Sequence, residues 1–296
     1  MTVRFYQSTD ASAPTIYGSV ASGYNLCNLL NAILVTGYGS LSAAGWTMPY
    51  TGTNKAAFLQ AGAGGQYLYV DDSAALYARV RGYETMSSIS AGTGPYPTDA
   101  QISGGGYLHR SSTSDTTARP WFCIADSTFF CLAVNYDSTA STGCSVLMFG
   151  DITSYKSSDA YHKLILCGTT ATATSYTSAD MTALATAATG HFMPRAYTQL
   201  GSAITLGKHT DSIKTGLSYP HPVDGGLYLG KIWIHEPTLG VVRGELRGVW
   251  FPLCTPIRSL NHGDTFSGTG ALSGKSFLFV NVYNAKALIL ETSNTW

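Results

Sequence analysis

Apolar residues recur along most of the chain in short runs that are separated by polar, turn-forming residues. The stretch 129–151, FFCLAVNYDSTASTGCSVLMFGD, is apolar at both ends and polar in the middle. With the apolar run before it, this pattern predicts a three-strand β-meander at 121–125, 128–135 and 144–152. The linker STASTG is typical of a hairpin loop.

Other segments repeat this plan. The stretch 65–86, GQYLYVDDSAALYARVRGYETM, alternates around a predicted turn at Asp71 and Asp72. The runs 226–237 and 241–253 predict one hairpin, and 275–293 predicts a closing hairpin around 284–286. Prolines lie at segment ends, where a missing N–H does least harm to a sheet, at Pro220, Pro222, Pro237, Pro252 and Pro256.

Helical spacing is confined to two segments. Within 24–36, leucines and isoleucine follow the three-and-four spacing of an amphipathic helix, with Ser22 as a candidate N-cap and Gly37 as the stop. Segment 178–189, SADMTALATAAT, is a second candidate helix, although its threonines lower helix propensity. The spaced apolar residues of the first helix are Leu26, Leu29, Leu30, Ile33 and Leu34.

These elements predict a mainly β fold of antiparallel, sandwich-like sheets, in one or two sandwiches. The N-terminal amphipathic helix packs on or beside the sheets, and the second candidate helix is short. We expect a helix-containing segment at 1–60 and a β-rich body at 61–296, with about 61–170 and 171–296 as candidate lobes. The Gly- and Ser-rich stretch 88–106 is the predicted long exposed loop or lobe boundary. No fixed internal period is present, which disfavours a solenoid or propeller.

Charged residues are scarce. They make up 11% of the chain, against about 25% in typical soluble domains. The 17 basic and 17 acidic residues cancel, so no field draws the protein toward nucleic acid or an anionic membrane. Asp outnumbers Glu by 13 to 4, which favours a turn-rich β protein. A weakly charged surface also suits a chain packed against other subunits.

The six cysteines form no CxxC pair and no close cluster with histidine, so neither a zinc site nor a disulfide framework is predicted. Free, buried thiols are favoured over a disulfide. The first residues, MTVRFYQSTD, lack an apolar signal core, and no apolar run approaches the roughly 20 residues of a membrane span. We therefore expect assembly in a reducing cytoplasm without membrane insertion. The cysteines are Cys27, Cys123, Cys131, Cys144, Cys167 and Cys254.

Motifs for catalysis or ligand binding are weak. The stretch 268–276, GTGALSGKS, misses the phosphate-binding loop because Thr269 stands where glycine is needed, and a strand-like run follows it. A glycine-rich turn is therefore favoured over nucleotide binding. Asp71 and Asp72 resemble a glycosidase carboxylate pair only superficially, because adjacent strand residues point to opposite faces. A turn is the favoured interpretation there too.

The histidines are scattered singly, without HExxH, and no GxSxG elbow is present. Structural roles are favoured for them, with a metal site built from distant strands as the alternative. We predict no catalytic, cofactor-binding or metal-binding residue, no cofactor, and no enzyme activity; a hydrolase with a dispersed triad is the third-ranked alternative. The histidines are His109, His162, His191, His209, His221, His235 and His262.

The 19 tyrosines and 5 tryptophans raise one further alternative, because sugars stack on exposed aromatic faces. Aromatic residues at alternating strand positions more often belong to the core, which is the favoured interpretation. If sugars do bind, tyrosines of the predicted loop, such as Tyr96 or Tyr107, are the candidates.

Several short motifs resemble a group of virion structural proteins of tailed bacteriophages. In that group a strand beginning with Trp, an Ala-Asp turn, an aromatic strand and then FGD with a following Tyr recur. The stretches RGELRGVWFPL (243–253), NHGDTFSGTGALSGKSF (261–277) and LETSNTW (290–296) are similar to the group as well. Together these stretches cover about half of the chain. The first set of matching positions is Trp121, Ala125, Asp126, Phe129, Phe130, Phe149, Gly150, Asp151 and Tyr155.

The resemblance implies a non-enzymatic particle component in the tail or baseplate, and it transfers no catalytic residue. We expect the chain to act by assembly as a homo-oligomer with other virion proteins, made in the host cytoplasm and located in the virion. The alternative is a receptor- or carbohydrate-binding module at a tail fibre or tail tip, with a host surface glycan as partner. No nucleic-acid partner is expected.

Overall fold

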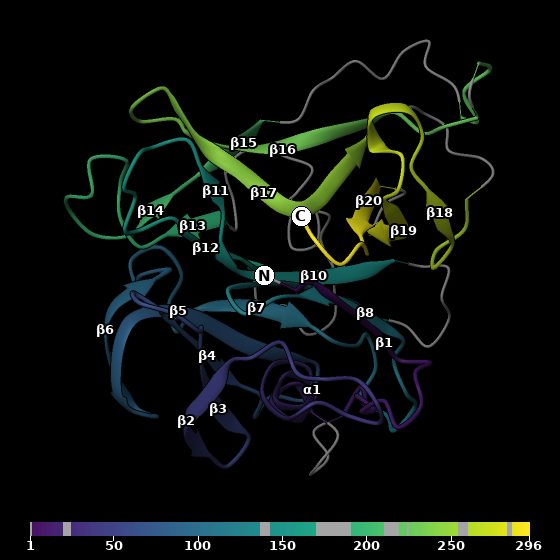
Figure 1. Cartoon of the computed structure of the whole chain (residues 1–296). Helices are drawn as coiled ribbons and strands as arrows, with labels where there is room; N and C mark the ends of the chain where they lie inside the picture. The colour runs from purple at the N-terminus through teal and green to yellow at the C-terminus, as the bar shows by residue number, and fades with distance from the viewer. Residues whose placement is uncertain are drawn as a thin grey trace.

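A computed structural model of the chain describes residues 2–19, 25–136, 143–169, 191–209, 219–223, 225–253, 260–282 and 286–296. The predicted mainly β class is confirmed, with antiparallel and mixed sheets and one short α-helix (Figure 1). The second candidate helix at 178–189 and Cys254 lie outside the described residues. No helix in the described ranges is long and apolar enough to cross a membrane.

The smaller sheet is antiparallel and has the strand order β2-β3-β4-β5-β6, with β7 paired to the first half of β5. It lies with α1 in the lower part of Figure 1. Its strands are β2 (Thr47–Gly52), β3 (Lys55–Leu59), β4 (Tyr67–Asp71), β5 (Tyr77–Ser88), β6 (Ala91–Tyr96) and β7 (Gly106–His109).

The larger sheet has the order β1-β8-β9-β10-β19-β20-β17-β16-β15. Five short strands pair at its sides: β11 with β17, β12 with β10, β13 with β12, β14 with β13 and β18 with β19. Its main strands are β1 (Arg4–Gln7), β8 (Trp121–Ala125), β9 (Phe129–Asn135), β10 (Cys144–Asp151), β15 (Gly207–His209), β16 (Leu229–Glu236), β17 (Val241–Pro252), β19 (Ser276–Val282) and β20 (Lys286–Glu291). The side strands are β11 (Thr153–Ser154), β12 (Lys163–Leu166), β13 (His191–Met193), β14 (Ile204–Thr205) and β18 (Thr265–Ser267).

The larger sheet turns sharply where β10 meets β19. These two strands are parallel and share a single register pair, Cys144 with Val282. Beyond this point β16, β17, β19 and β20 cross above β8 to β10 (Figure 1), and one apolar cluster joins both groups of strands. The sheet thus folds over and packs against itself like a sandwich.

The predicted β-meander is confirmed by the antiparallel pairing of β8 with β9 and of β9 with β10. Every residue of β9 is buried. Phe130, Leu132 and Val134 belong to the cluster shared with α1 and the smaller sheet, whereas Phe129 and Cys131 belong to the cluster inside the folded sheet. The continuous apolar run at 129–134 therefore reflects a strand that is covered on both faces.

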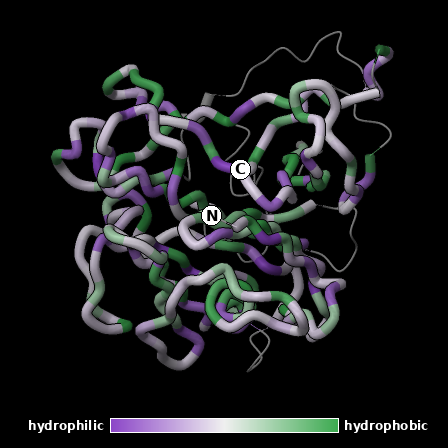
Figure 2. Tube along the Cα trace, in the orientation of Figure 1, coloured by the Kyte–Doolittle hydropathy of each residue, from purple (hydrophilic) through white to green (hydrophobic). Residues whose placement is uncertain are grey.

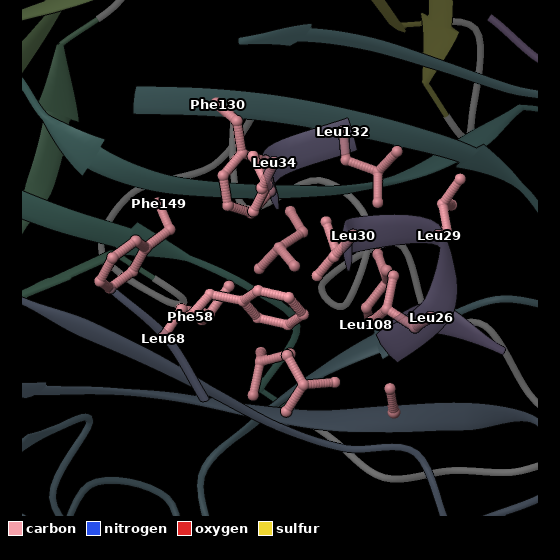
Figure 3. Packing of buried hydrophobic residues seen from close by; sticks show 14 of the residues in the cluster. Leu26, Leu29, Leu30, Leu34, Phe58, Leu68, Leu108, Phe130, Leu132 and Phe149 are labelled. Carbon is pink, nitrogen blue, oxygen red and sulfur yellow. The ribbon is translucent and has the colours of Figure 1, made fainter. Parts of the chain in front are cut away.

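The N-terminal helix predicted at 24–36 with Gly37 as its stop is confirmed, although only its first part is an α-helix. The α-helix α1 (Leu26–Asn31) continues as one π-helical turn, η1 (Ala32–Thr36), and ends at Gly37 with φ +76°. Asn25 is the N-cap and accepts from the backbone N–H of Asn28 at 3.0 Å; the predicted cap, Ser22, lies outside the described residues. Figure 3 shows the helix leucines among side chains of both sheets.

The other hairpins are confirmed as β16 with β17 and β19 with β20. The apolar cluster that α1 shares with both sheets contains residues from Tyr6 to Phe192. The two ends of the chain also meet, because the backbone N–H of Val3 donates to the carbonyl of Asn294 at 2.9 Å. The division into a segment at 1–60 and two lobes stays a prediction.

The prediction of a long exposed loop at 88–106 is wrong. Residues 91–96 form β6, and the side chains of Tyr96 and Ile102 are buried. The glycines there serve close packing instead. A Cβ on Gly92 would lie 2.6 Å from the Tyr83 ring, so glycine lets that ring rest on the neighbouring strand.

The hairpin predicted at 65–86 is confirmed by the antiparallel pairing of β4 with β5, but its connection covers 72–76, so that only Asp72 of the two aspartates belongs to it. Asp71 ends β4, and Asp72 is fully buried in an ion pair with the equally buried Arg110. Asp72 also accepts from the backbone N–H of Leu26, the first residue of α1, at 2.5 Å. Turn propensity favoured a surface position for Asp72, and its distant partner leaves no local sequence signal.

We expect Asp72→Asn to lower the free energy of unfolding by about 3–5 kcal/mol, because it leaves the Arg110 charge buried and unpaired. Asp71→Asn is the matched control, since Asp71 pairs with the partly exposed Lys55 and such a pair contributes about 0–1 kcal/mol. Urea denaturation of both variants makes the comparison. Equal losses in the two variants would contradict the structural role assigned to Asp72.

Candidate functional site

The glycine-rich turn predicted at 268–276 is confirmed. It contains one 3-10 turn, η2 (Gly270–Leu272), and Ser276 begins β19. Lys275 Nζ lies 2.5 Å from Glu291 Oε1, so the lysine is engaged by a carboxylate of the neighbouring strand. No helix follows whose N-terminal amides could hold a phosphate.

The two adjacent aspartates do not form a carboxylate pair. Asp71 binds Lys55 at 2.9 Å on the surface of the smaller sheet, and Asp72 binds Arg110 in the interior. Each carboxylate thus belongs to its own ion pair, which is unlike the facing carboxylates of a glycosidase.

The histidines are dispersed, as the sequence indicates. His162 contacts Asp151, His221 contacts the Tyr228 hydroxyl at 2.6 Å, and His262 contacts Asn135. Within the described ranges, no three or more His, Cys, Asp or Glu side chains are grouped to hold a metal ion. The five described cysteines are free and buried, as predicted.

The structure does bring together a Cys, a His and an Asn that sequence reasoning missed. Cys144 Sγ lies 2.7 Å from Asn135 Oδ1 and 3.7 Å from His262 Nε2. His262 Nε2 lies 2.9 Å from the same Asn135 oxygen. This combination of residue types occurs in cysteine proteases, so its hydrogen bonding decides what it can do.

The hydrogen bonds do not activate the thiol. The backbone N–H of Asn281 donates to His262 Nδ1 at 3.0 Å, so the neutral ring carries its proton on Nε2 and donates to Asn135. The ring therefore presents no lone pair to the sulfur. Burial lowers the pKa of His262 to about 4 and raises the pKa of the Cys144 thiol well above its ordinary value. The cluster joins β9, β10 and the segment before β18 as a neutral, structural unit.

Some of the residues in the motifs behind the phage resemblance meet at one place, which we call the motif junction: Asp126, Arg247, Gly248, Glu291 and Trp296. Arg247 Nη2 lies 2.6 Å from the buried Asp126 carboxylate, and its guanidinium carbon is 5.3 Å from the centre of the Trp296 ring. Asp126 Oδ1 also accepts from the backbone N–H of Phe129 at 2.8 Å. The turn between β8 and β9 is thereby tied to β17 and to the last residue.

Trp296 is held from several sides. Its Nε1–H donates to the Glu291 carbonyl at 3.1 Å, and its ring meets Phe129 edge-on at 5.7 Å. Gly248 has φ +63°, and a Cβ there would lie 2.3 Å from the Trp296 ring. The Glu291 carboxylate accepts from Trp250 Nε1 at 3.0 Å as well as binding Lys275. Separate sequence motifs therefore form one packed unit.

A second buried charge network lies beside an open groove. Arg243 and the Asp159 carboxylate are both fully buried and form two hydrogen bonds of 2.7 and 2.9 Å. Arg243 also reaches Glu236 at 3.4 Å. The groove above has a volume of about 520 Å³. It is lined by Ile152, Ser154, Lys156, Ser158, Asp159, Ala160 and His162.

Asp159 and His162, the acid and the histidine of the groove, are already engaged. Both Asp159 oxygens bind Arg243, and His162 bonds to the Asp159 carbonyl through Nδ1 and to Asp151 through Nε2 at 3.1 Å. Both ring nitrogens thus face acceptors, and the bond to Asp151 is the main cause that raises the pKa of His162. The groove offers polar contacts without an available base.

No model of a known protein family matches the chain, and no curated protein sequence matches it either.

We expect Gly248→Ala to destabilise the fold through two effects. The left-handed backbone costs about 1–2 kcal/mol with a Cβ, and the clash with Trp296 adds about 1–3 kcal/mol. Gly240→Ala is the control, because Gly240 has φ +65° but open space around its Cβ position. Denaturant unfolding of both variants separates strain from clash. A Gly248→Ala loss no larger than that of Gly240→Ala would remove the packing role of Trp296.

We expect His262 to stay neutral from pH 8 down to about pH 5 and to titrate near 4, because burial disfavours its charged form. The unfolded chain protonates this ring near its ordinary 6.5, so the stability it contributes is lost as the pH falls from 6.5 toward 4. NMR titration of the histidine ring protons measures this directly. A His262 midpoint near 6.5, or alkylation of Cys144 in the native protein, would contradict the neutral structural cluster.

Proposed function

We propose that this chain is a non-enzymatic structural component of a tailed-bacteriophage particle, placed in the tail or baseplate, and that it works by assembly with other copies and other virion proteins. The observation that carries the proposal is the motif junction. Three of the stretches behind the resemblance lie far apart in the sequence, yet Arg247 of one contacts both Asp126 and Trp296 of the others.

The nature of these contacts supports a structural role for the motifs. They fill positions that fix one strand against another: a buried carboxylate, its guanidinium partner, and a glycine under an indole ring. A chain that keeps these residues keeps this junction, so the resemblance is one of scaffold. The catalytic-looking Cys144, His262 and Asn135 are bonded in a way that leaves the thiol protonated.

The small number of charged residues, and the burial of several of them, supports the same proposal. Charged residues are 11% of the sequence, and several of them are used in the interior, at Arg110, Asp72 and Arg243. Many of the exposed residues are Ser, Thr and Gly, and protein interfaces are depleted of charge in their centres. Such a surface suits a subunit that is covered by neighbours.

Host-glycan recognition at a tail tip is the second candidate function. One specific observation favours it. Four tyrosines of the smaller sheet are half-buried on the face that points away from the core: Tyr50, Tyr67, Tyr69 and Tyr83. This role is compatible with membership of the particle.

The proposal is tested on purified particles of the phage that encodes the chain. Mass spectrometry is expected to detect the chain in several copies per particle, and immunogold labelling with antibody against it is expected to mark the distal tail. Labelling of the head or neck would contradict the tail assignment. Absence of the chain from purified particles by both methods would overturn the virion proposal itself.

A further inference from the structure

Alternation along β4 separates two sets of side chains. Leu68 and Val70 are fully buried and belong to the core under the smaller sheet. Tyr67 and Tyr69 point to the opposite face and are half-buried. Tyr50 on β2 and Tyr83 on β5 are half-buried as well and contact these two rings. We call these four residues the tyrosine face.

The rings of the tyrosine face lie in two contacting pairs. Tyr50 and Tyr67 are stacked, with ring centres 6.2 Å apart and planes at 25°. Tyr69 meets Tyr83 edge-on at 6.4 Å. Tyr67 and Tyr83 are direct register partners on β4 and β5, so the two pairs run together across the strands. Cross-strand aromatic contacts of this kind hold each ring in place.

Small residues let the rings lie over the sheet. Ala57 is register partner of both Tyr50 and Tyr69, and although it alternates with the core residues Ala56 and Phe58, its side chain is fully buried. Tyr50 and Tyr69 thus flank it on the two neighbouring strands. On β6, next to the strand that carries Tyr83, Gly92 leaves room for the Tyr83 ring, because a Cβ at this position would lie 2.6 Å from the ring. The aromatic surface is therefore preformed on paired strands of the sheet.

Two of the three basic side chains beside these rings form ion pairs, and the third, Arg79, lies over a ring. Lys55 binds Asp71 at 2.9 Å, and Arg81 binds Asp99 at 2.7 Å. Arg79 lies with its guanidinium carbon 5.4 Å from the centre of the Tyr107 ring. An acidic or strongly basic ligand would meet little net field here, whereas an uncharged ligand with many hydroxyl groups would meet hydrogen-bonding side chains beside aromatic rings.

We propose that the tyrosine face binds a neutral polysaccharide. The C–H faces of sugar rings stack on the tyrosine rings, and the sugar hydroxyls bond to tyrosine hydroxyls and to Arg79 at the border. This inference deepens the second candidate function and does not depend on tail assembly. It also moves the site from where the sequence placed it, because Tyr96 is fully buried and Tyr107 is 6% exposed.

The test uses the full-length recombinant chain on an array of neutral bacterial and plant polysaccharides, followed by calorimetry with the best oligosaccharide. We expect Tyr67→Ala and Tyr83→Ala to weaken binding roughly tenfold or more. Tyr67→Phe is expected to stay within about threefold of the original chain, because it keeps the ring and loses one hydroxyl. Tyr228→Ala is the matched control, since Tyr228 is 40% exposed and lies outside the tyrosine face.

Circular dichroism and thermal unfolding of each variant separate lost binding from lost folding. Binding that disappears in folded Tyr67→Ala and persists in Tyr228→Ala supports the proposal. Absence of any neutral glycan ligand for the original chain overturns it, as does unchanged affinity in both face variants. A change of oligomeric state in these variants without any glycan binding also overturns it and assigns the face to a protein contact. Mass spectrometry of purified particles tests the assembly proposal separately, so that either proposal can fail without the other.

Discussion

Burial of β8, β9 and β10 on both faces is the constraint on which the rest of the structure depends. A strand that is covered twice needs an apolar residue at every position, and 129–134 provides them. One face then requires α1 and the smaller sheet as a cover, and the other requires the larger sheet to fold back at β10 and β19. Figure 2 shows the same arrangement, with hydrophobic segments gathered around the middle strands.

Two networks of ion pairs are buried in the interior. Arg110 with Asp72 fixes the start of α1 against the strand connection, and Arg243 with Asp159 and Glu236 fixes the loops above β17. Buried ion pairs add little net stability compared with apolar contacts, but breaking one is costly. Several of the few charged residues therefore connect segments in the interior. This use of charge is consistent with the proposed structural role.

Elements with a regular period could be predicted from the sequence, and pairings between distant segments could not. The meander at 121–152 and the closing hairpins follow from apolar runs and polar turns. The stretch 88–106 was misjudged because glycine marks both loops and strands that carry a neighbour's aromatic ring, as Gly92 does for Tyr83. Asp72 was misjudged because its partner Arg110 lies 38 positions away.

The candidate sites could not be predicted for the same reason, because they bring together residues from distant segments. The cluster of Cys144, His262 and Asn135 draws on three segments, and no spacing in the sequence marks it. The tyrosines of β4 could be assigned to a face by alternation, but which face is the core depends on where the sheet packs. Motif positions such as Asp126 and Trp296 gained a physical meaning only when the fold brought them into contact with Arg247.

The most direct test of assembly through shape is a cryo-electron microscopy reconstruction of the intact particle at a resolution that traces strands. The account predicts repeated copies of this fold in a symmetric arrangement of the tail, with the motif junction inside each subunit and weakly charged surfaces between subunits. Density for the tail that is fully explained by other chains, with no copy of this fold, would contradict it.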